Sequence, residues 1–238
     1  MSHEEVRSMI DGARSIAVMT GAGISAESGV PTFRGPGGLW REFRPEDLAT
    51  PEAFERDPRL VWEWYAWRRG QIAEAKPNLA HYALVTLEKR APELTVITQN
   101  VDGLHAQAGS RALLEIHGSI WRTRCLSCRR VQEDRRVPVP ELPPRCGCGG
   151  LLRPDVVWFG EPLPFDTARK AFLAVDACDL MLVIGTSGTV EPAASMAFRA
   201  LERGARVIEI NAEPTPLSDR ATRALRGKAA QIVPELIG

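Results

Sequence analysis

Short apolar runs alternate along the chain with longer segments in which apolar residues recur at helical spacing. Five runs predict buried strands, at residues 15–20, 94–98, 113–116, 180–184 and 206–210, and a sixth predicts a short last strand at residues 231–233. Helical patterns cover residues 4–12, 58–75, 77–90, 164–175, 192–203 and 216–225, and several begin at or near a proline, which suits a first helical turn. This alternation predicts an α/β fold, a Rossmann-like doubly wound parallel sheet with helices on both faces.

Polar or glycine-rich residues follow each of the five longer strands. They are residues 21–23 (GAG), 99–102 (QNVD), 117–118 (HG), 185–187 (GTS) and Asn211. In open parallel sheets, ligands bind beyond the carboxyl ends of the strands. We therefore expect these residues to meet in one binding site.

Residues 122–150 break this rhythm, because they contain four cysteines, many arginines and several prolines with little apolar periodicity. Cys125 and Cys128 form a CxxC pair, and Cys146 and Cys148 form a CxC pair after 17 intervening residues. Four thiolates can close a tetrahedral zinc site, and a closed site is structural. The alternatives are two disulfides or free thiols. We expect a small zinc-binding module here.

The length of 238 residues is enough for one large domain and one small one. We expect residues 1–121 and 151–238 to form the main domain, with residues 122–150 as the inserted zinc-binding module. Lys+Arg and Asp+Glu are balanced at 30 each, which argues against binding to nucleic acid or to a membrane surface. Cys178, the fifth cysteine, precedes an apolar strand and is most simply a core residue.

The N-terminal residues 1–14 lack the apolar core of a signal peptide, and no apolar run approaches the roughly 20 residues of a membrane span. We therefore expect a cytoplasmic protein. In a reducing compartment, paired cysteines bind metal more often than they form disulfides, which favours the zinc interpretation.

The first glycine-rich turn, residues 21–25 (GAGIS), follows a strand, so its backbone N–H groups could approach a pyrophosphate. The spacing is not G-x-G-x-x-G, and a tight turn without a ligand is the alternative. A hydride-transfer dehydrogenase would show that fingerprint followed by an acidic residue about 20 positions on. The continuation to Trp40 is a glycine-rich loop that carries Phe33 and Arg34. Such a loop could close over a bound dinucleotide and exclude water.

Five motifs, in this order, resemble those of the sirtuins. They are residues 21–25 (GAGIS), 31–34 (PTFR), 98–105 (TQNVDGLH), 114–118 (LEIHG) and 183–187 (VIGTS). The resemblance covers essentially the whole chain, and the cysteines lie where sirtuins place theirs. Residues 65–68 (YAWR) and 153–161 (RPDVVWFGE) most resemble the class III branch, the sirtuin-5-like and bacterial deacylases.

The resemblance implies NAD-dependent removal of acyl groups from protein lysines, with release of nicotinamide and 2′-O-acyl-ADP-ribose. NAD would be the co-substrate, and one zinc ion would be structural. The acyl oxygen would attack the ribose as nicotinamide leaves, and a base would then deprotonate a ribose hydroxyl. His117 suits this role because imidazole titrates near neutral pH. Asn100 and Asp102 match positions that hold the nicotinamide ribose and carboxamide, and Gln99 would orient the ribose hydroxyls. These side chains could instead only cap the following helix.

The resemblance also assigns the remaining cofactor contacts, and it gives His105 a packing role. The expected NAD-binding residues besides those three are Gly21, Ala22, Gly23, Ser25, Phe33, Arg34, Gly185, Thr186, Ser187, Asn211, Glu213 and Ala229.

The acyl-lysine substrate is expected against Val157, Phe159 and Gly160, whose backbone could pair with an extended peptide. Tyr65 and Arg68 lie three apart in a helical segment and so project from one face. A guanidinium can grip a carboxylate with two parallel hydrogen bonds, which predicts a preference for succinyl and malonyl groups besides acetyl. In isolation, Arg68 would be interpreted as a surface arginine and Tyr65 as a core residue.

Two other functions stay open at this stage: protein ADP-ribosylation from the same NAD site, and a catalytically silent NAD-binding adaptor. The intact set of polar residues around His117 argues against the adaptor. The expected partners are acyl-lysine proteins, and the sequence leaves the oligomeric state open, with a monomer compatible. Asp155 and Gly188 depart from the pattern of close relatives, and either could alter substrate binding.

Overall fold

A six-stranded parallel sheet forms the larger part of the protein, whose computed structural model describes residues 2–34 and 38–238. The strands lie in the order β3-β2-β1-β7-β8-β9. Their bounds are β1 Ser15–Thr20, β2 Glu93–Thr98, β3 Leu113–Glu115, β7 Leu180–Ile184, β8 Arg206–Asn211 and β9 Arg223–Arg226. The predicted doubly wound parallel sheet is confirmed. The strand order reverses at β1 and β7, where such sheets bind ligands.

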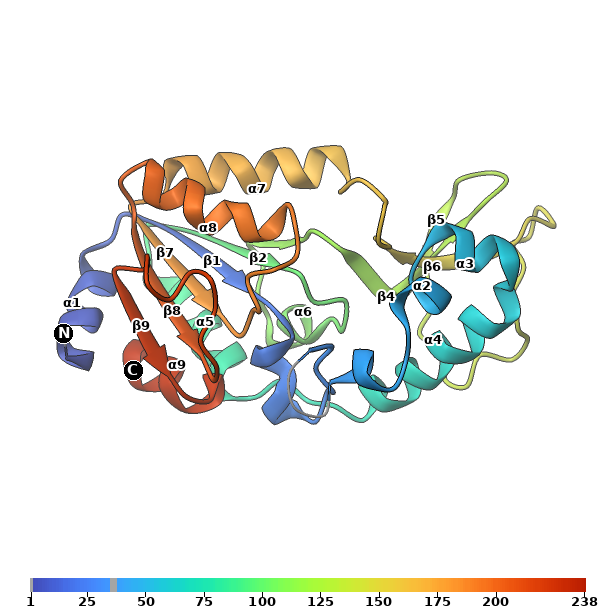
Figure 1. Cartoon of the computed structure of the whole chain (residues 1–238), viewed down its shortest axis with the longest axis horizontal. Helices are drawn as coiled ribbons and strands as arrows, with labels where there is room; N and C mark the ends of the chain where they lie inside the picture. Colours follow the sequence, from blue (N-terminus) through green and yellow to red (C-terminus); the bar gives the residue numbers. More distant parts are fainter. Residues whose placement is uncertain (1, 35–37) are drawn as a thin grey trace.

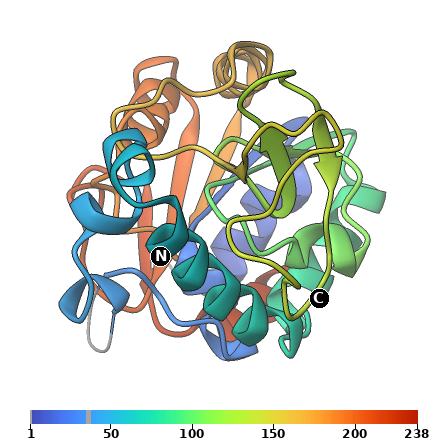
Figure 2. The same cartoon turned by 90° about the vertical axis from the view of Figure 1, so that its right-hand side faces the viewer.

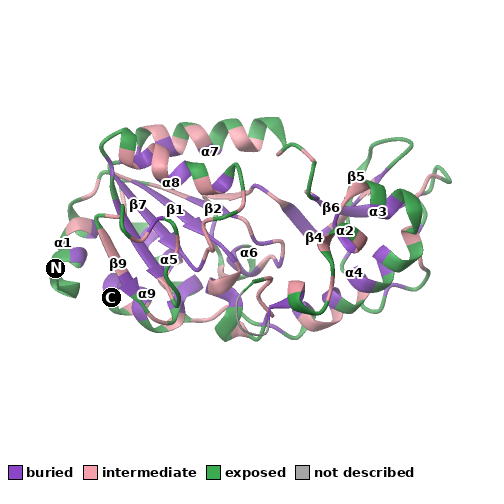
Figure 3. Cartoon of the chain, in the orientation of Figure 1, coloured by how far each residue is buried: buried purple, intermediate pink, exposed green. Residues whose placement is uncertain are grey.

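Alternate residues of the central strands enter two different apolar cores, and Figure 3 shows these strands as largely buried. In β1, Ile16 and Val18 pack with α1, α5 and α9, whereas Ala17 and Met19 pack with α7 and α8. Because successive side chains of a strand point to opposite faces, a strand covered by helices on both faces is apolar throughout. The helices are α1 His3–Gly12, α5 Leu79–Arg90, α7 Phe165–Ala177, α8 Ala193–Glu202 and α9 Ala229–Ile237.

A second, smaller layer lies beyond the carboxyl ends of the main sheet (Figure 1), and it faces the viewer in Figure 2. It contains a three-stranded antiparallel sheet in the order β5-β4-β6 and the helices packed on it. Its elements are β4 Gly118–Cys125, β5 Val131–Glu133, β6 Leu152–Val156, α2 Pro45–Leu48, α3 Pro51–Arg56 and α4 Pro58–Ala73. Strand β4 begins before residue 122, and β6 lies wholly after residue 150. The division into a module at residues 122–150 stays a prediction.

Three shorter elements complete the fold. The 3-10 helices η1 Ala22–Ser28 and η2 Leu39–Arg41 lie between β1 and α2, and the helix α6 Leu104–Ala108 lies between β2 and β3. The predicted glycine-rich loop includes residues 35–37, which lie outside the described residues. Among the described residues, no helix has the length and apolar composition that a membrane span requires.

Two predicted elements near the C-terminus are wrong. Residues 216–225 do not form a helix: they form turns that lead into β9, which pairs in parallel with β8. The spacing of Leu217, Ala221 and Leu225 imitates a helix, but Leu225 lies in a strand. Residues 231–233 do not form a strand, because they belong to α9. The β-branched pair there suggested a strand, whereas Ile232, Val233 and Leu236 lie on one buried helix face.

Candidate functional site

A cavity of about 650 Å³ lies between the carboxyl ends of the main sheet and the smaller layer. Most of the sequence-predicted site residues line it. They are Gly21, Ala22, Gly23, Phe33, Arg34, Tyr65, Arg68, Gln99, Asn100, His117, Val157, Phe159, Gly160, Gly185, Thr186, Ser187, Asn211, Glu213 and Ala229. Of the predicted NAD-binding and substrate-binding residues, only Ser25 and Asp102 are absent from this lining, and both are buried. Segments far apart in sequence, such as residues 21–23 and 185–187, thus line one cavity, because parallel strands end at the same edge of the sheet.

The loops after β1 and β7 touch at the floor of the cavity, and glycines make this contact possible. The Gly23 N–H donates to the Gly185 carbonyl over 2.8 Å. A Cβ at Gly23 would lie 2.7 Å from Gly185 Cα, and Gly185 has φ +62. Larger residues at either position would separate the two loops. The backbone of residues 21–23 also lines the cavity and can contact a ligand there.

Polar side chains below the cavity fix Asn100 and Asp102 in place. Asn100 Nδ2 donates to the Gly21 carbonyl over 3.1 Å and to Ser25 Oγ over 3.2 Å. Ser25 Oγ donates to the Asp102 carboxylate over 2.8 Å, and that carboxylate also accepts from the Leu104 N–H. Burial raises the pKa of Asp102, while the hydrogen bonds from Leu104 and Ser25 lower it. The Asp102 carboxylate therefore holds the first N–H of α6 and also orders the loop after β1, although the N-cap residue of α6 is Gly103.

His117 stands at the end of β3 with one ring nitrogen already paired. Its Nδ1 lies 3.1 Å from the Gln99 carbonyl oxygen, which can only accept, so Nδ1 carries the hydrogen. Nε2 is then the nitrogen with the free lone pair. Burial lowers the pKa of His117 below its ordinary value, and the bond to Gln99 opposes this shift. The imidazole is therefore neutral and able to accept a proton at neutral pH.

Gly118 lets β4 begin directly after His117. It has φ +79, and a Cβ there would lie 2.1 Å from the Asp155 carbonyl oxygen on β6. The Val157 N–H donates to the His117 carbonyl over 2.9 Å, which connects the histidine to the segment after β6. Asp155, the departure noted in the sequence, accepts a hydrogen bond from Arg122 at 3.1 Å and forms an ion pair with Arg124 at 3.2 Å. It braces β4 against β6 and does not line the cavity.

Arg68 is buried in the wall of the cavity formed by α4, with 2% of its surface exposed. The alternative of a surface arginine is therefore wrong. Its guanidinium lies 4.9 Å from the centre of the Phe33 ring and 5.8 Å from that of Trp64. Its hydrogen bond to the Pro31 carbonyl is long, at 3.5 Å. In the part of the chain that the structure describes, no carboxylate lies within ion-pair distance of it. Burial lowers its pKa to about 10.

Tyr65 lies one helical turn before Arg68 and is also buried in this wall. Its hydroxyl oxygen accepts a hydrogen bond from Trp158 Nε1 at 2.9 Å. The sequence resemblance placed Trp158 within residues 157–161, one expected wall of the acyl-lysine site, but gave it no contact of its own. Indole is a common core side chain, and only the fold shows that its N–H reaches a residue 93 positions away.

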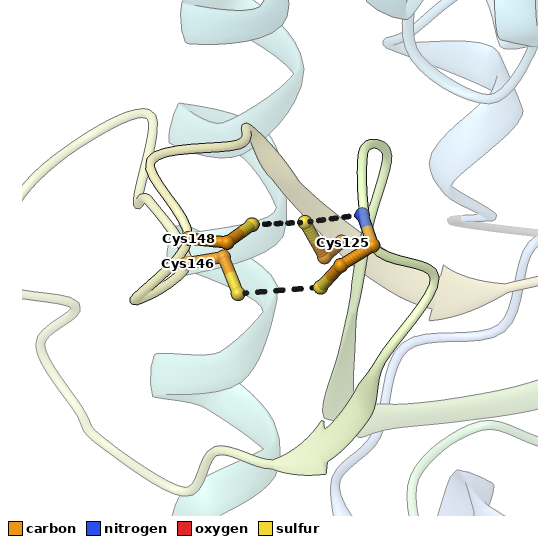
Figure 4. Close-up of side chains that lie close together, drawn as sticks. Cys125, Cys146 and Cys148 are labelled. Atoms are coloured by element: carbon orange, nitrogen blue, oxygen red, sulfur yellow. Dashed lines mark hydrogen bonds between the residues drawn. The ribbon is translucent and has the colours of Figure 1, made fainter.

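The four predicted cysteines of the smaller layer converge, and Figure 4 labels Cys125, Cys146 and Cys148 among them. Their sulfur atoms all lie within 4.8 Å of one another. Cys125 and Cys148 are 3.5 Å apart, and Cys128 and Cys146 are 3.8 Å apart. Disulfides have a length of about 2.05 Å, so the disulfide alternative is wrong. Four thiolates around zinc, each at about 2.3 Å, lie roughly 3.8 Å apart, so the cluster fits one structural zinc ion.

A Rossmann-like sheet whose switch-point cleft faces a small four-cysteine layer defines a dinucleotide-binding α/β protein with an added metal site. The model of the Sir2 family matches residues 21–192. The chain is 55% identical over 233 residues to the NAD-dependent protein deacylase 2 of Pyrobaculum aerophilum, which covers 98% of this chain and 93% of that relative.

Solved structures agree. A Sir2 homologue in complex with NAD has a TM-score of 0.93 at 48% identity, covering 98% of this chain and 92% of that one. A Sir2 homologue variant in complex with 2′-O-acetyl ADP ribose has a TM-score of 0.94 at 47% identity, covering 100% and 95%. The chain belongs to the Sir2 family, so the sirtuin resemblance is confirmed.

Proposed function

We infer that this protein is an NAD-dependent protein-lysine deacylase whose acyl pocket favours acidic groups such as succinyl and malonyl over acetyl. The deacylase activity follows from the family and from relatives named for it at about half identity. The acidic preference rests on a single observation, the buried Arg68 in the cavity wall. The cysteine cluster suits a reducing compartment, and we propose that the protein acts in the cytoplasm.

The loops at the carboxyl ends of β1, β7 and β8 fit a dinucleotide. NAD supplies, when bound, a ribose carbon from which nicotinamide departs and a ribose hydroxyl that receives the acyl group. Residues 21–23 and 185–187 would hold the phosphates through backbone N–H groups and hydroxyls. Asn211 and Glu213 would hold the adenosine ribose, at the far end of the same cavity, with Ala229 beside the adenine.

His117 is the proposed general base. Its Nδ1 hydrogen is held by the Gln99 carbonyl, so Nε2 is left to take a proton from a ribose hydroxyl. Gln99 Nε2 donates to Thr186 Oγ1 over 2.9 Å, which fixes the side chain that would orient those hydroxyls. Asn100 would hold the nicotinamide ribose from the cavity floor, where two hydrogen bonds orient its amide.

The acyl-lysine side chain would enter along Val157, Phe159 and Gly160 and reach Tyr65 and Arg68. A buried guanidinium without a carboxylate partner has lost its hydrogen bonds to water. An acceptor group of a ligand would replace them. A succinyl carboxylate can accept two parallel hydrogen bonds from the guanidinium, whereas an acetyl methyl group can accept none. The difference corresponds to about 2–5 kcal/mol in favour of the acidic group.

The test is Arg68→Met, assayed for kcat/KM on succinyl, malonyl and acetyl forms of one lysine peptide. Succinyl activity should fall at least about 30-fold more than acetyl activity. Arg68→Lys keeps the charge but loses the planar fork, so it should keep part of the preference. Equal loss of all three activities would show that Arg68 is structural.

Protein ADP-ribosylation uses the same NAD site with a protein nucleophile in place of the acyl oxygen. Incubation with adenine-labelled NAD separates the two activities. Deacylation yields labelled free acyl-ADP-ribose and leaves the protein unlabelled. An adaptor without activity would give neither product, and the ordered set of Gln99, Asn100 and His117 around the cavity argues against it.

A further inference from the structure

The Tyr65 hydroxyl has one hydrogen-bond partner among the described residues, and that partner decides which way its hydrogen can point. The partner is Trp158 Nε1, at 2.9 Å. An indole N–H can only donate, so the Tyr65 oxygen must be the acceptor. No protein group in the described part of the chain accepts the hydroxyl hydrogen. The hydrogen of Tyr65 is therefore left for a ligand.

Trp158 is held firmly enough to impose this direction. Its side chain is buried, and its ring lies 3.4 Å below the Arg153 guanidinium and 5.2 Å from the Phe54 ring. Arg153 forms two hydrogen bonds to Glu161, at 2.6 and 2.8 Å. Glu161 also accepts from the Trp158 backbone N–H at 2.9 Å. The Arg153–Glu161 ion pair thus contacts both the backbone and the ring of Trp158, and it fixes the orientation of the indole.

Tyr65 keeps its hydrogen under any ordinary assay condition. Burial raises the pKa of Tyr65 to about 12, and the hydrogen bond from Trp158 opposes this only in part. Arg68 lines the same cavity wall one helical turn further along α4. A ligand carboxylate, which is acceptor-only when ionised, would therefore meet donors from both side chains.

We propose that Trp158 is a specificity-determining positioning residue, whose indole N–H makes the Tyr65 hydroxyl a donor aimed at acidic acyl groups. This inference rests on the acidic-acyl pocket proposed above. Without the indole N–H, the Tyr65 oxygen would be free to accept from Arg68, and both groups would then be partly satisfied without a ligand. An acetyl group has no carboxylate to accept from Tyr65, so only the activity on succinyl substrates should fall. The ratio of succinyl to acetyl activity should therefore decrease.

Trp158→Phe removes the indole N–H and keeps an aromatic ring under Arg153. The ratio of succinyl to acetyl kcat/KM should fall about 3- to 10-fold, since one hydrogen bond to a charged group is weakened. Trp62→Phe is the matched control. Trp62 is a buried tryptophan of α4 that donates to the Leu152 carbonyl at 2.8 Å beside Arg69, and it does not line the cavity. This control should leave the ratio unchanged.

A double-mutant cycle with Tyr65→Phe shows whether Trp158 acts through the hydroxyl. In the Tyr65→Phe background, Trp158→Phe should no longer change the ratio. If Trp158→Phe unfolds the protein, benzothienylalanine at position 158 keeps the bicyclic ring and removes only the N–H. An unchanged ratio in that variant, or an equal fall with and without the Tyr65 hydroxyl, overturns the inference.

The same experiments separate this inference from the proposed pocket. If Arg68→Met abolishes the acidic preference while Trp158→Phe leaves it intact, the pocket stands and the role of Trp158 is wrong. If the unaltered protein shows no preference for succinyl over acetyl peptides, the pocket itself is wrong and the role of Trp158 fails with it.

Discussion

Acid should destabilise this protein well above the range in which carboxylates titrate, because two histidines are buried together. His81 on α5 and His105 on α6 have 0% and 2% of their surface exposed, and their ring centres are 4.8 Å apart. His105 Nε2 is 2.9 Å from Thr20 Oγ1, while His81 Nε2 has no hydrogen-bond partner. Burial lowers the pKa of His81 to about 4 and that of His105 to about 3, where the neighbouring His81 adds to the shift.

The sign follows from proton binding in the two states. Below the ordinary pKa of 6.5, both histidines take up protons in the unfolded chain and stay neutral in the folded protein. The free energy of unfolding therefore falls as the pH drops from 6.5 towards 4. Each histidine contributes a slope of about 1.4 kcal/mol per pH unit. Between pH 7 and pH 5 the two together remove about 4 kcal/mol, a large part of the roughly 5–15 kcal/mol typical of a domain.

The assay is denaturant unfolding at pH 7, 6 and 5, followed by far-UV circular dichroism. His81→Gln is the informative variant, because glutamine keeps a polar side chain that takes up no proton. It should lower the stability at pH 7 but halve the loss between pH 7 and pH 5. A loss of less than about 1 kcal/mol in the unaltered protein would refute the reasoning, since the buried histidines would then be protonated in the fold.

The two remaining predictions concern the base and the metal. His117→Ala should keep the fold and much of the NAD binding while turnover falls about 10²–10⁴-fold, and the unaltered enzyme should lose activity as the pH drops through a pKa lowered below 6.5. A near-normal rate of deacylation by His117→Ala, measured in single-turnover assays, would remove His117 from the mechanism. One zinc ion per chain should be found by metal analysis, and its removal should unfold the smaller layer, because the cysteines join β4 to the segment before β6. Full activity in zinc-free protein would contradict a structural role.

The main sheet was predictable because its strands obey one simple rule. The central strands are buried on both faces, so β1 and β7 appear in the sequence as mostly apolar runs that are followed by glycine. The C-terminal region was not predictable in the same way. There, β9 is an edge strand with mixed burial, and its pairing with β8 decides its conformation against a helical spacing. Local pattern is a weak guide where tertiary pairing outweighs it.

The NAD-binding half and the acyl-binding half of the cavity also differed in how far the sequence could predict them. The NAD half depends on short contiguous motifs, in which glycines at 23 and 185 permit one close backbone contact. Such motifs can be recognised from sequence, although the sequence did not show that these glycines are required by contact between two loops. Here the structure adds a physical reason for a pattern that was already visible.

The acyl-binding half depends instead on the absence of a carboxylate partner for Arg68. Whether Arg68 has a carboxylate partner is a property of residues from several distant segments, since Phe33, Trp64 and the Pro31 carbonyl surround it. Neither nearby group of the protein pairs with it: Arg153 already binds both oxygens of Glu161. The Asp102 carboxylate, whose charge acts on Arg68 from beyond ion-pair distance, accepts its hydrogen bonds from Ser25 and the Leu104 N–H. One buried arginine of this region is therefore neutralised within the protein and the other is left for a ligand. That division of partners between two arginines is invisible in the order of residues, and it determines which acyl group the pocket should select.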